Sequence, residues 1–157
     1  MRDVLKLIAA ILISQAAGAI GSIFTFTAIN EWYAYLRKPP ITPPSWVFSP
    51  VWTLLYTMMG IAAWLVWRKG LQSAGVKAAL TLFLVQLVFN AAWSVLFFGL
   101  RSPLWAFVEI CFLWAAIALT TVAFFGLSRA AWVLMLPYLL WVTFAAVLNY
   151  WVYWLNC

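Results

Sequence analysis

Five long apolar runs, separated by short polar connections, make up almost the whole chain. They cover residues 4–29, 47–67, 76–98, 104–125 and 131–154. Each run reaches the roughly 20 residues that an α-helix needs to cross about 30 Å of hydrocarbon at about 1.5 Å per residue. We therefore expect an all-α integral membrane protein, a five-transmembrane-helix bundle that forms a single membrane domain over residues 1–157.

The first run also has features of a secretory signal peptide. Arg2 and Lys6 lie at its start, and the small residues at 16–19 resemble a cleavage region. However, the apolar stretch continues well beyond the roughly 7–15 residues of a signal-peptide core. We therefore expect a retained helix.

The only long connection covers residues 30–46. It contains the aromatic residues Trp32, Tyr33 and Trp46, the basic pair Arg37 and Lys38, and the prolines Pro39, Pro40, Pro43 and Pro44. Proline stiffens the backbone, and aromatic side chains hold a loop against the membrane face. The pattern predicts a long structured loop that caps one end of the bundle.

Composition supports the membrane assignment and excludes most catalytic chemistry. Hydrophobic residues make up 68% of the 157 positions and charged residues 8%, against roughly 45–50% and 25% in soluble domains. Without histidine, the chain has no Ser-His-Asp triad, His-ligated zinc or proximal-His haem. Asp3, Glu31 and Glu109 are too scattered to suggest a carboxylate pair or a metal cage. We expect no metal site, no cofactor and no disulfide between Cys111 and Cys157.

The basic residues indicate an orientation in the membrane. The N-terminal side would carry Arg2, Lys6, Arg68, Lys69, Lys77 and Arg129, and the opposite side Arg37, Lys38 and Arg101. The positive-inside rule then places the N-terminus inside and the C-terminus outside. Because these residues stand alone or in pairs at the ends of apolar runs, orientation explains the net charge of +6 better than binding to nucleic acid.

Twelve tryptophans require an explanation. Eight lie near the ends of the runs, where indole rings commonly sit at headgroup level. The other four, Trp52, Trp93, Trp114 and Trp141, lie deeper, where an indole N–H needs a partner.

Three helical faces would bring aromatic and polar side chains together beneath the loop. They consist of Trp52, Tyr56 and Met59, of Gln86, Asn90, Trp93 and Phe97, and of Trp141, Ala145 and Asn149. Such a set forms either a pocket for a flat apolar ligand, with Arg37 or Lys38 meeting an anionic substituent at its mouth, or an ordinary packed interior.

Two further features leave alternatives open. Glu109, in the fourth run, is either functional or hydrogen-bonds a loop, Arg101 or the cap. The first run carries two rows of small residues, Ser14, Gly18 and Ser22 and Ala17, Gly21 and Thr25. These rows permit close helix packing, either inside the bundle or between subunits.

Motifs along nearly the whole chain, from Trp32 to Asn156, match a known family. They are Trp32-Tyr33, Leu36, Lys38-Pro39 and Pro43-Pro44 in the loop; Phe48, Trp52-Thr53, Leu55-Tyr56 and Met59-Gly60; Gln86, Asn90, Trp93-Ser94 and Phe97-Phe98-Gly99; Pro103, Ala106, Glu109 and Trp114; and Pro137-Tyr138, Trp141, Ala145, Asn149 and Leu155-Asn156. The chain resembles the tryptophan-rich sensory protein/translocator protein family, the TspO/MBR family or peripheral benzodiazepine receptors. Its short uncharged tail is typical of prokaryotic members.

The resemblance implies a five-helix receptor or sensor that binds protoporphyrin IX and similar flat apolar ligands beneath the first loop, with ligand transport as a related role, and that forms homodimers. The implied ligand-binding positions are Tyr33, Pro43, Pro44, Phe48, Trp52, Tyr56, Asn90, Trp93, Trp141 and Ala145. Trp52 and Trp141 also match tryptophans implicated in light-dependent porphyrin breakdown, so they are the candidate catalytic residues.

One motif of the mitochondrial members is missing. Their proposed cholesterol motif requires a basic residue after a tyrosine near the C-terminus, and neither Tyr150 nor Tyr153 is followed by one.

Three functions remain for the chain: a porphyrin-binding receptor, a light- and oxygen-dependent porphyrin-degrading enzyme, and a scaffold whose aromatic residues only pack.

Overall fold

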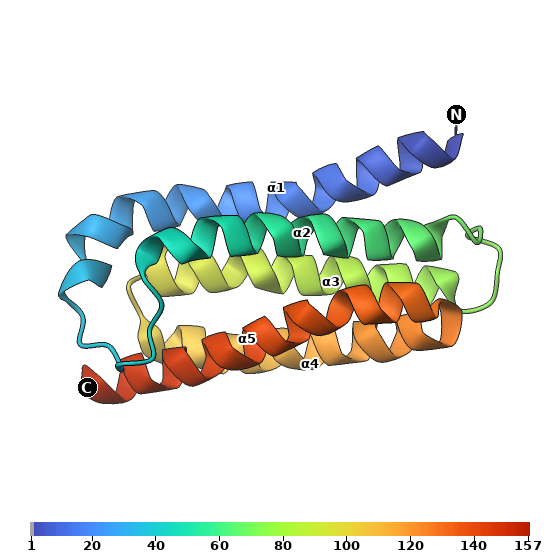
Figure 1. Cartoon of the computed structure of the whole chain (residues 1–157). Helices are drawn as coiled ribbons and strands as arrows, with labels where there is room; N and C mark the ends of the chain where they lie inside the picture. Colours follow the sequence, from blue (N-terminus) through green and yellow to red (C-terminus); the bar gives the residue numbers. More distant parts are fainter. Residues whose placement is uncertain (1) are drawn as a thin grey trace.

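The computed structural model describes residues 2–157, which form five long helices along a common axis (Figure 1). These are α1 (Arg2–Glu31), α2 (Ser45–Trp67), α3 (Val76–Ser94), α4 (Pro103–Leu127) and α5 (Arg129–Leu155). A 3-10 turn, η1 (Tyr33–Tyr35), lies in the α1–α2 connection, and a π-helical turn, η2 (Val95–Gly99), extends α3. Residues 2–157 contain no strand.

All five helices are long and apolar enough to cross a bilayer, with mean hydropathy of 1.4 to 2.2 over their most apolar windows. This confirms the predicted all-α bundle and identifies a multi-pass integral membrane protein. The helices begin at or just before the first apolar residue of each predicted run and end within a few residues of its last.

Proline, serine and glycine set the helix boundaries. α2 follows Pro44, and Pro103 occupies the first turn of α4, where no backbone donor is lost. The Ser128 hydroxyl accepts a hydrogen bond from the Ala131 backbone N–H at 3.3 Å and caps α5. Gly70 and Gly75 have φ of 95° and 79°, a conformation that favours glycine, and allow the chain to turn between α2 and α3.

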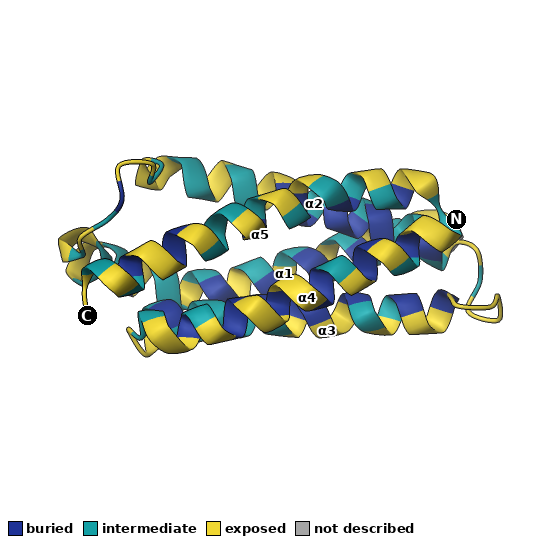
Figure 2. Cartoon of the chain, turned by 90° about the horizontal axis from the view of Figure 1, so that it is seen from below, coloured by how far each residue is buried: buried dark blue, intermediate teal, exposed yellow. Residues whose placement is uncertain are grey.

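The two ends of the bundle differ. The α1–α2 connection and the C-terminus lie at one end, hereafter the capped end, while the N-terminus and the α2–α3 connection lie at the other (Figure 1). α1 packs against α2 and α3, α2 also packs against α5, and α4 lies between α3 and α5. Buried residues follow the inward faces of the helices, and the outward faces carry exposed apolar residues such as Leu12 and Val122 that suit contact with lipid (Figure 2).

The small residues of α1 pack inside the bundle. A Cβ added to Gly18 would overlap the Tyr56 ring, and one added to Gly21 would lie 2.7 Å from Ser94 Oγ. From the other side, a Cβ added to Gly60 of α2 would lie 2.6 Å from Ile11 Cα. Of the two roles that the sequence leaves open for these rows, the structure uses packing within the chain.

Asn156, at the end of α5, holds the loop over the capped end. Its Oδ1 accepts a hydrogen bond from the Arg37 backbone N–H at 3.0 Å, and its Nδ2 donates to the Arg37 carbonyl at 2.9 Å. Pro39 is buried, and the Thr42 backbone N–H donates to the Pro39 carbonyl at 3.0 Å. The loop is therefore structured, as its prolines and aromatic residues predict.

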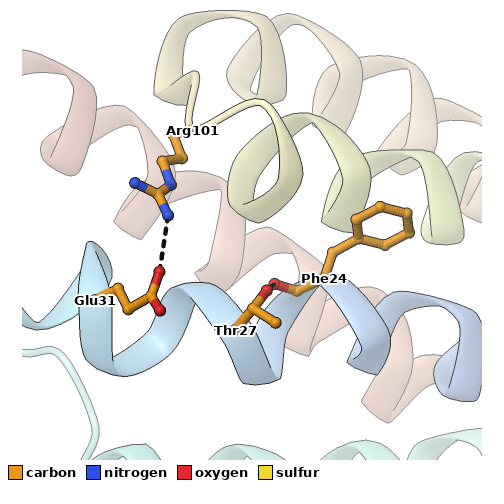
Figure 3. A network of polar contacts seen from close by, with 4 residues as sticks. All are labelled: Phe24, Thr27, Glu31 and Arg101. Atoms are coloured by element: carbon orange, nitrogen blue, oxygen red, sulfur yellow. Dashed lines mark hydrogen bonds and ion pairs between the residues drawn. The ribbon is translucent and has the colours of Figure 1, made fainter.

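An ion pair joins the end of α1 to the α3–α4 connection. Arg101 lies 3.1 Å from Glu31, beside the turn in which the Thr27 hydroxyl donates to the Phe24 carbonyl (Figure 3). The Arg101 and Glu31 side chains are 49% and 68% exposed, so the pair contributes at most about 1 kcal/mol to stability. The pair places the end of α1 beside the α3–α4 connection.

Replacing Asn156 tests whether it secures the loop. Asn156→Ala removes both hydrogen bonds to Arg37, each worth roughly 0.5–1.5 kcal/mol, so the backbone amides of residues 33–44 should exchange several-fold faster while those of α2 to α5 keep their rates. Hydrogen exchange read by mass spectrometry in nanodiscs measures this. Asn30→Ala, which changes an exposed amide without a side-chain hydrogen bond, is the control, and equal loop exchange in both variants would contradict the assignment.

Candidate functional site

A cavity of about 560 Å³ lies inside the capped half of the bundle. Residues of α1, α2, α3 and α5 form its walls, Ile110 and Leu113 of α4 contribute to the back, and Tyr33 of η1 closes the top. The lining is mostly apolar and aromatic with a few polar groups, and the volume falls within the roughly 300–1,000 Å³ that is common for small-molecule sites.

Eight of the ten predicted ligand-binding residues line this cavity. They are Tyr33, Phe48, Trp52, Tyr56, Asn90, Trp93, Trp141 and Ala145. Pro43 and Pro44 are not among the lining residues. Instead, Pro44, with φ of −55° and ψ of 145°, directs the loop into the first turn of α2.

A chain of buried hydrogen bonds crosses the floor of the cavity. The Tyr56 hydroxyl donates to Asn90 Oδ1 at 2.5 Å, and Asn90 Nδ2 donates to the Tyr138 hydroxyl at 2.9 Å. The Tyr138 hydroxyl in turn donates to Gln86 Oε1 at 2.8 Å. These bonds join α2, α3 and α5, and satisfy polar groups that would otherwise be costly in an apolar environment.

Aromatic rings form the wall that α2 and α5 share. The Trp52 ring stacks on Tyr56 with centroids 5.4 Å apart and meets the edge of Tyr138 at 6.2 Å. Phe48 meets Trp141 edge to face at 6.0 Å. Trp141 Nε1 is buried and has no hydrogen-bond partner among the described residues. The wall thus offers flat apolar surface to the cavity, whereas the Trp141 N–H is covered by protein atoms.

Near the top, η2 brings a second aromatic group to the cavity. Trp93 stacks on Phe97 with centroids 5.0 Å apart, and Tyr33 meets Phe97 and Phe98 at their edges. Trp93 Nε1 donates to Asn149 Oδ1 at 2.9 Å, and Asn149 Nδ2 donates to the Pro103 carbonyl at 2.8 Å. This arrangement fixes the top of α3 against α5 and the start of α4.

The basic pair of the loop does not line the cavity. Lys38 Nζ donates to the Ala34 and Leu36 carbonyls at 3.3 and 3.1 Å and lies 4.6 Å from the centroid of Tyr33, while Arg37 is exposed. Burial raises the pKa of the Tyr33 phenol and lowers that of the Lys38 ammonium. At the top of the cavity a neutral phenol, rather than a free cation, therefore faces inward.

Sequence reasoning missed the wall that α1 contributes. This wall includes Gln15, Gly18, Ala19, Gly21, Ser22, Thr25, Phe26 and Ile29, and α2 adds Ser45, Ser49 and Thr53. The two rows of small residues in the first run were the available signal. A row of small residues does not reveal which helix it meets, so the signal alone could not assign them to the site.

Two deep residues considered from the sequence lie elsewhere. Trp114 Nε1 donates to Thr143 Oγ1 at 2.8 Å, beside a shallow outward groove between α4 and α5. Glu109 is 8% exposed, and neither carboxyl oxygen has a hydrogen-bond partner among the described residues. Of the alternatives that the sequence leaves open for Glu109, a contact with Arg101 is not found among the described residues, where Arg101 pairs with Glu31.

Comparison with known proteins gives consistent matches along the chain. The model of the TspO/MBR family matches residues 10–155. The chain is 45% identical to the tryptophan-rich protein TspO of Archaeoglobus fulgidus over 155 residues, which covers 98% of this chain and 99% of the relative. It is 42% identical to the TspO protein of Chlorobaculum tepidum over 155 residues, 99% and 98% of the two chains. It is also 42% identical to the human translocator protein over 135 residues, 85% and 80% of the two chains.

The floor of the cavity can be tested through stability. Asn90→Leu keeps the approximate volume but leaves the Tyr56 hydroxyl without its acceptor and Tyr138 without a donor. We expect a loss of roughly 1–3 kcal/mol, seen as a lower midpoint of thermal unfolding by circular dichroism in detergent. Thr143→Val, which removes the exposed bond to Trp114, serves as the control. A midpoint for Asn90→Leu no lower than that of Thr143→Val would contradict a structural role for the floor.

Proposed function

The chain belongs to the TspO/MBR family, and from that premise we propose that it is a membrane receptor that binds porphyrins and similar flat, apolar ligands in the capped cavity. Passage of the bound ligand into or along the membrane is the related role. The observation that carries the proposal is the cavity itself, in which aromatic faces from three helices surround about 560 Å³ beneath an ordered loop.

The chemistry of the walls supports a planar ligand. The indole rings of Trp52 and Trp141 present flat surface for stacking, which is most favourable in offset or edge-on geometry. Polar side chains in the lining, such as Asn90 near the floor, supply orientation for a ligand with polar groups. Because the chain has no histidine, a free-base porphyrin such as protoporphyrin IX suits the site better than a haem that requires an axial imidazole.

Orientation and assembly form part of the proposal. The excess of basic residues at the end opposite the cap supports an N-terminus inside and a cavity that faces the outer half of the bilayer. We also propose a homodimer. Its interface uses an outward face other than the small-residue rows of α1, since Gly18 and Gly21 pack within the chain.

Titration with protoporphyrin IX in the dark tests binding. We expect saturable quenching of tryptophan emission at about one porphyrin per chain, because several indoles line a single cavity. Ala145→Leu should weaken binding at least tenfold by filling the cavity, which corresponds to about 1.4 kcal/mol. Trp52→Phe should weaken it less, because a smaller aromatic face remains.

The neighbouring alanine provides a matched control. Ala146→Leu adds the same side chain on α5, but Ala146 lines the outward groove with Trp114 and not the cavity. The affinity of the Ala146→Leu variant for protoporphyrin IX should stay close to that of the unmodified protein. Unsaturable quenching, equal in all variants, would mean that the porphyrin only partitions into the micelle and would refute the proposal.

A second candidate function is light- and oxygen-dependent degradation of the porphyrin. It is favoured by the position of Trp52 and Trp141, the two oxidisable indoles of the α2 and α5 wall, both of which would touch a ligand in the cavity. The porphyrin absorbs the light, so the reaction needs no acid–base residue from the protein.

Illumination separates binding from degradation. If the protein is an enzyme, porphyrin in air should convert to a new absorbing species faster than with an equal amount of denatured protein, and the double variant Trp52→Phe/Trp141→Phe should lose the excess rate. Absorbance spectra taken during illumination provide the measurement. Equal rates for native and denatured protein would leave the receptor function alone.

A further inference from the structure

The cavity reaches the surface of the bundle through its side. On α1, the lining residues Ala19 and Phe26 are also exposed, Phe26 by 75%. On α2, the lining residues Ser45, Ser49 and Thr53 are exposed as well. The opening lies between two membrane-spanning helices, so it faces lipid along its length. We refer to the opening bounded by Ala19–Phe26 and Ser45–Thr53 as the α1–α2 slot.

Gln15 marks the closed end of the slot. Its Nε2 donates to the Thr53 carbonyl at 3.1 Å and to Thr57 Oγ1 at 3.0 Å. Towards the uncapped end, α1 and α2 touch directly where Gly60 meets Ile11, and the Trp64 indole donates to the Asp3 carbonyl at 3.0 Å. Towards the capped end, no side-chain hydrogen bond joins the described residues of α1 and α2. Side-chain hydrogen bonds therefore fasten the two helices from Gln15 downwards, and above Gln15 their contact is the packing of Gly18 against Tyr56, next to the exposed lining residues.

The rim of the slot is polar, which is unusual for a face that meets lipid. Ser45, Ser49 and Thr53 recur every four residues along α2, and Ser22 and Thr25 lie on α1. The Thr53, Ser22 and Thr25 hydroxyls donate to carbonyls of their own helices, so their oxygens keep lone pairs for a donor from outside. The Ser45 and Ser49 hydroxyls make no hydrogen bond within the described residues and can donate as well as accept.

We propose that the α1–α2 slot is the portal through which ligand passes between the bilayer and the cavity, and that its hydroxyl rim receives the polar edge of an amphipathic ligand. The inference rests on the proposed function. It adds the class of ligand, which is a flat apolar ring system with carboxyl, carbonyl or hydroxyl groups on one edge. It also assigns a role to Gln15, which positions α1 against α2 at the closed end of the portal.

The alternative entrance, through the cap, is held shut by direct contacts. Asn156 binds the backbone of Arg37 in two places, and the Tyr33 ring packs against Phe97 and Phe98. Entry at this end would break both sets of contacts. Entry through the slot breaks none of the hydrogen bonds that hold the loop, because those bonds join Asn156 to Arg37 and neither residue borders the slot.

Blocking the slot from outside provides the decisive experiment. In a Cys111→Ser/Cys157→Ser background, which removes both exposed thiols, Phe26→Cys is modified with a bulky maleimide at the lipid side of the opening. Two controls carry the same label: Ile23→Cys, 65% exposed on α1 but not in the lining, and Tyr35→Cys, 84% exposed on the cap. Protein in vesicles is mixed with vesicles that contain protoporphyrin IX, and the rate of tryptophan quenching is followed.

The portal predicts that the label at position 26, compared with the unlabelled Phe26→Cys protein, slows both quenching and its reversal by empty vesicles about tenfold, equivalent to about 1.4 kcal/mol in the barrier. The labels at 23 and 35 should leave the rate unchanged. An unchanged rate with the label at 26, or slowing by the label at 35, would overturn the portal and favour entry through the cap. If the unlabelled variants show no saturable quenching at all, the proposed function fails instead, so the two failures are distinguishable.

Gln15→Leu tests the closed end independently. Loss of both hydrogen bonds should let the helices part further. Tryptophan emission should then be quenched several-fold faster when porphyrin is added, and should recover several-fold faster when empty vesicles remove the porphyrin. Gln72→Leu, a change in the exposed α2–α3 connection, controls for the substitution. Equal rates for the two variants would show that Gln15 does not control the portal.

Discussion

The hydrogen-bond chain from Tyr56 through Asn90 and Tyr138 to Gln86 is the constraint on which the site depends. In hydrocarbon there is no water to satisfy a polar side chain, so these four groups must satisfy one another. Doing so holds α2, α3 and α5 at a common depth. The cavity lies above this floor, and aromatic rings of the same three helices line it.

α1 stands apart from this arrangement, and its sequence explains why. It contributes glycines and hydroxyls rather than large buried side chains at the capped half, and its close contacts are made where Gly60 or Gly18 removes a side chain from the interface. Such packing fastens a helix at particular points and leaves the space between them open. The wall that α1 forms is consequently the one with polar residues at an exposed seam, whereas the wall formed by α2 and α5 is closed by stacked rings.

Most of the site was predictable because helical spacing converts directly into direction. Once the runs are helices, Trp52 and Tyr56 must share a face, as must Asn90 and Trp93, and Trp141 and Ala145. The same reasoning could not place Pro43 and Pro44, because a loop has no fixed period. Pro44 instead directs the chain into the first turn of α2. It also could not pair Arg101, whose partner Glu31 is 70 residues away at the end of α1.

Hydropathy and helical period are properties of consecutive residues, so the amino-acid sequence alone is enough to predict the five spans, the capped end and the faces that turn inward. Three features follow from the packed fold instead: which helices are neighbours, that Gly18 and Gly21 of α1 pack in the interior, and that Asn156 holds the backbone of Arg37 at the capped end. These are contacts between distant segments. Their geometry depends on how five similar apolar helices pack, and near-uniform hydrophobicity carries little information about that choice.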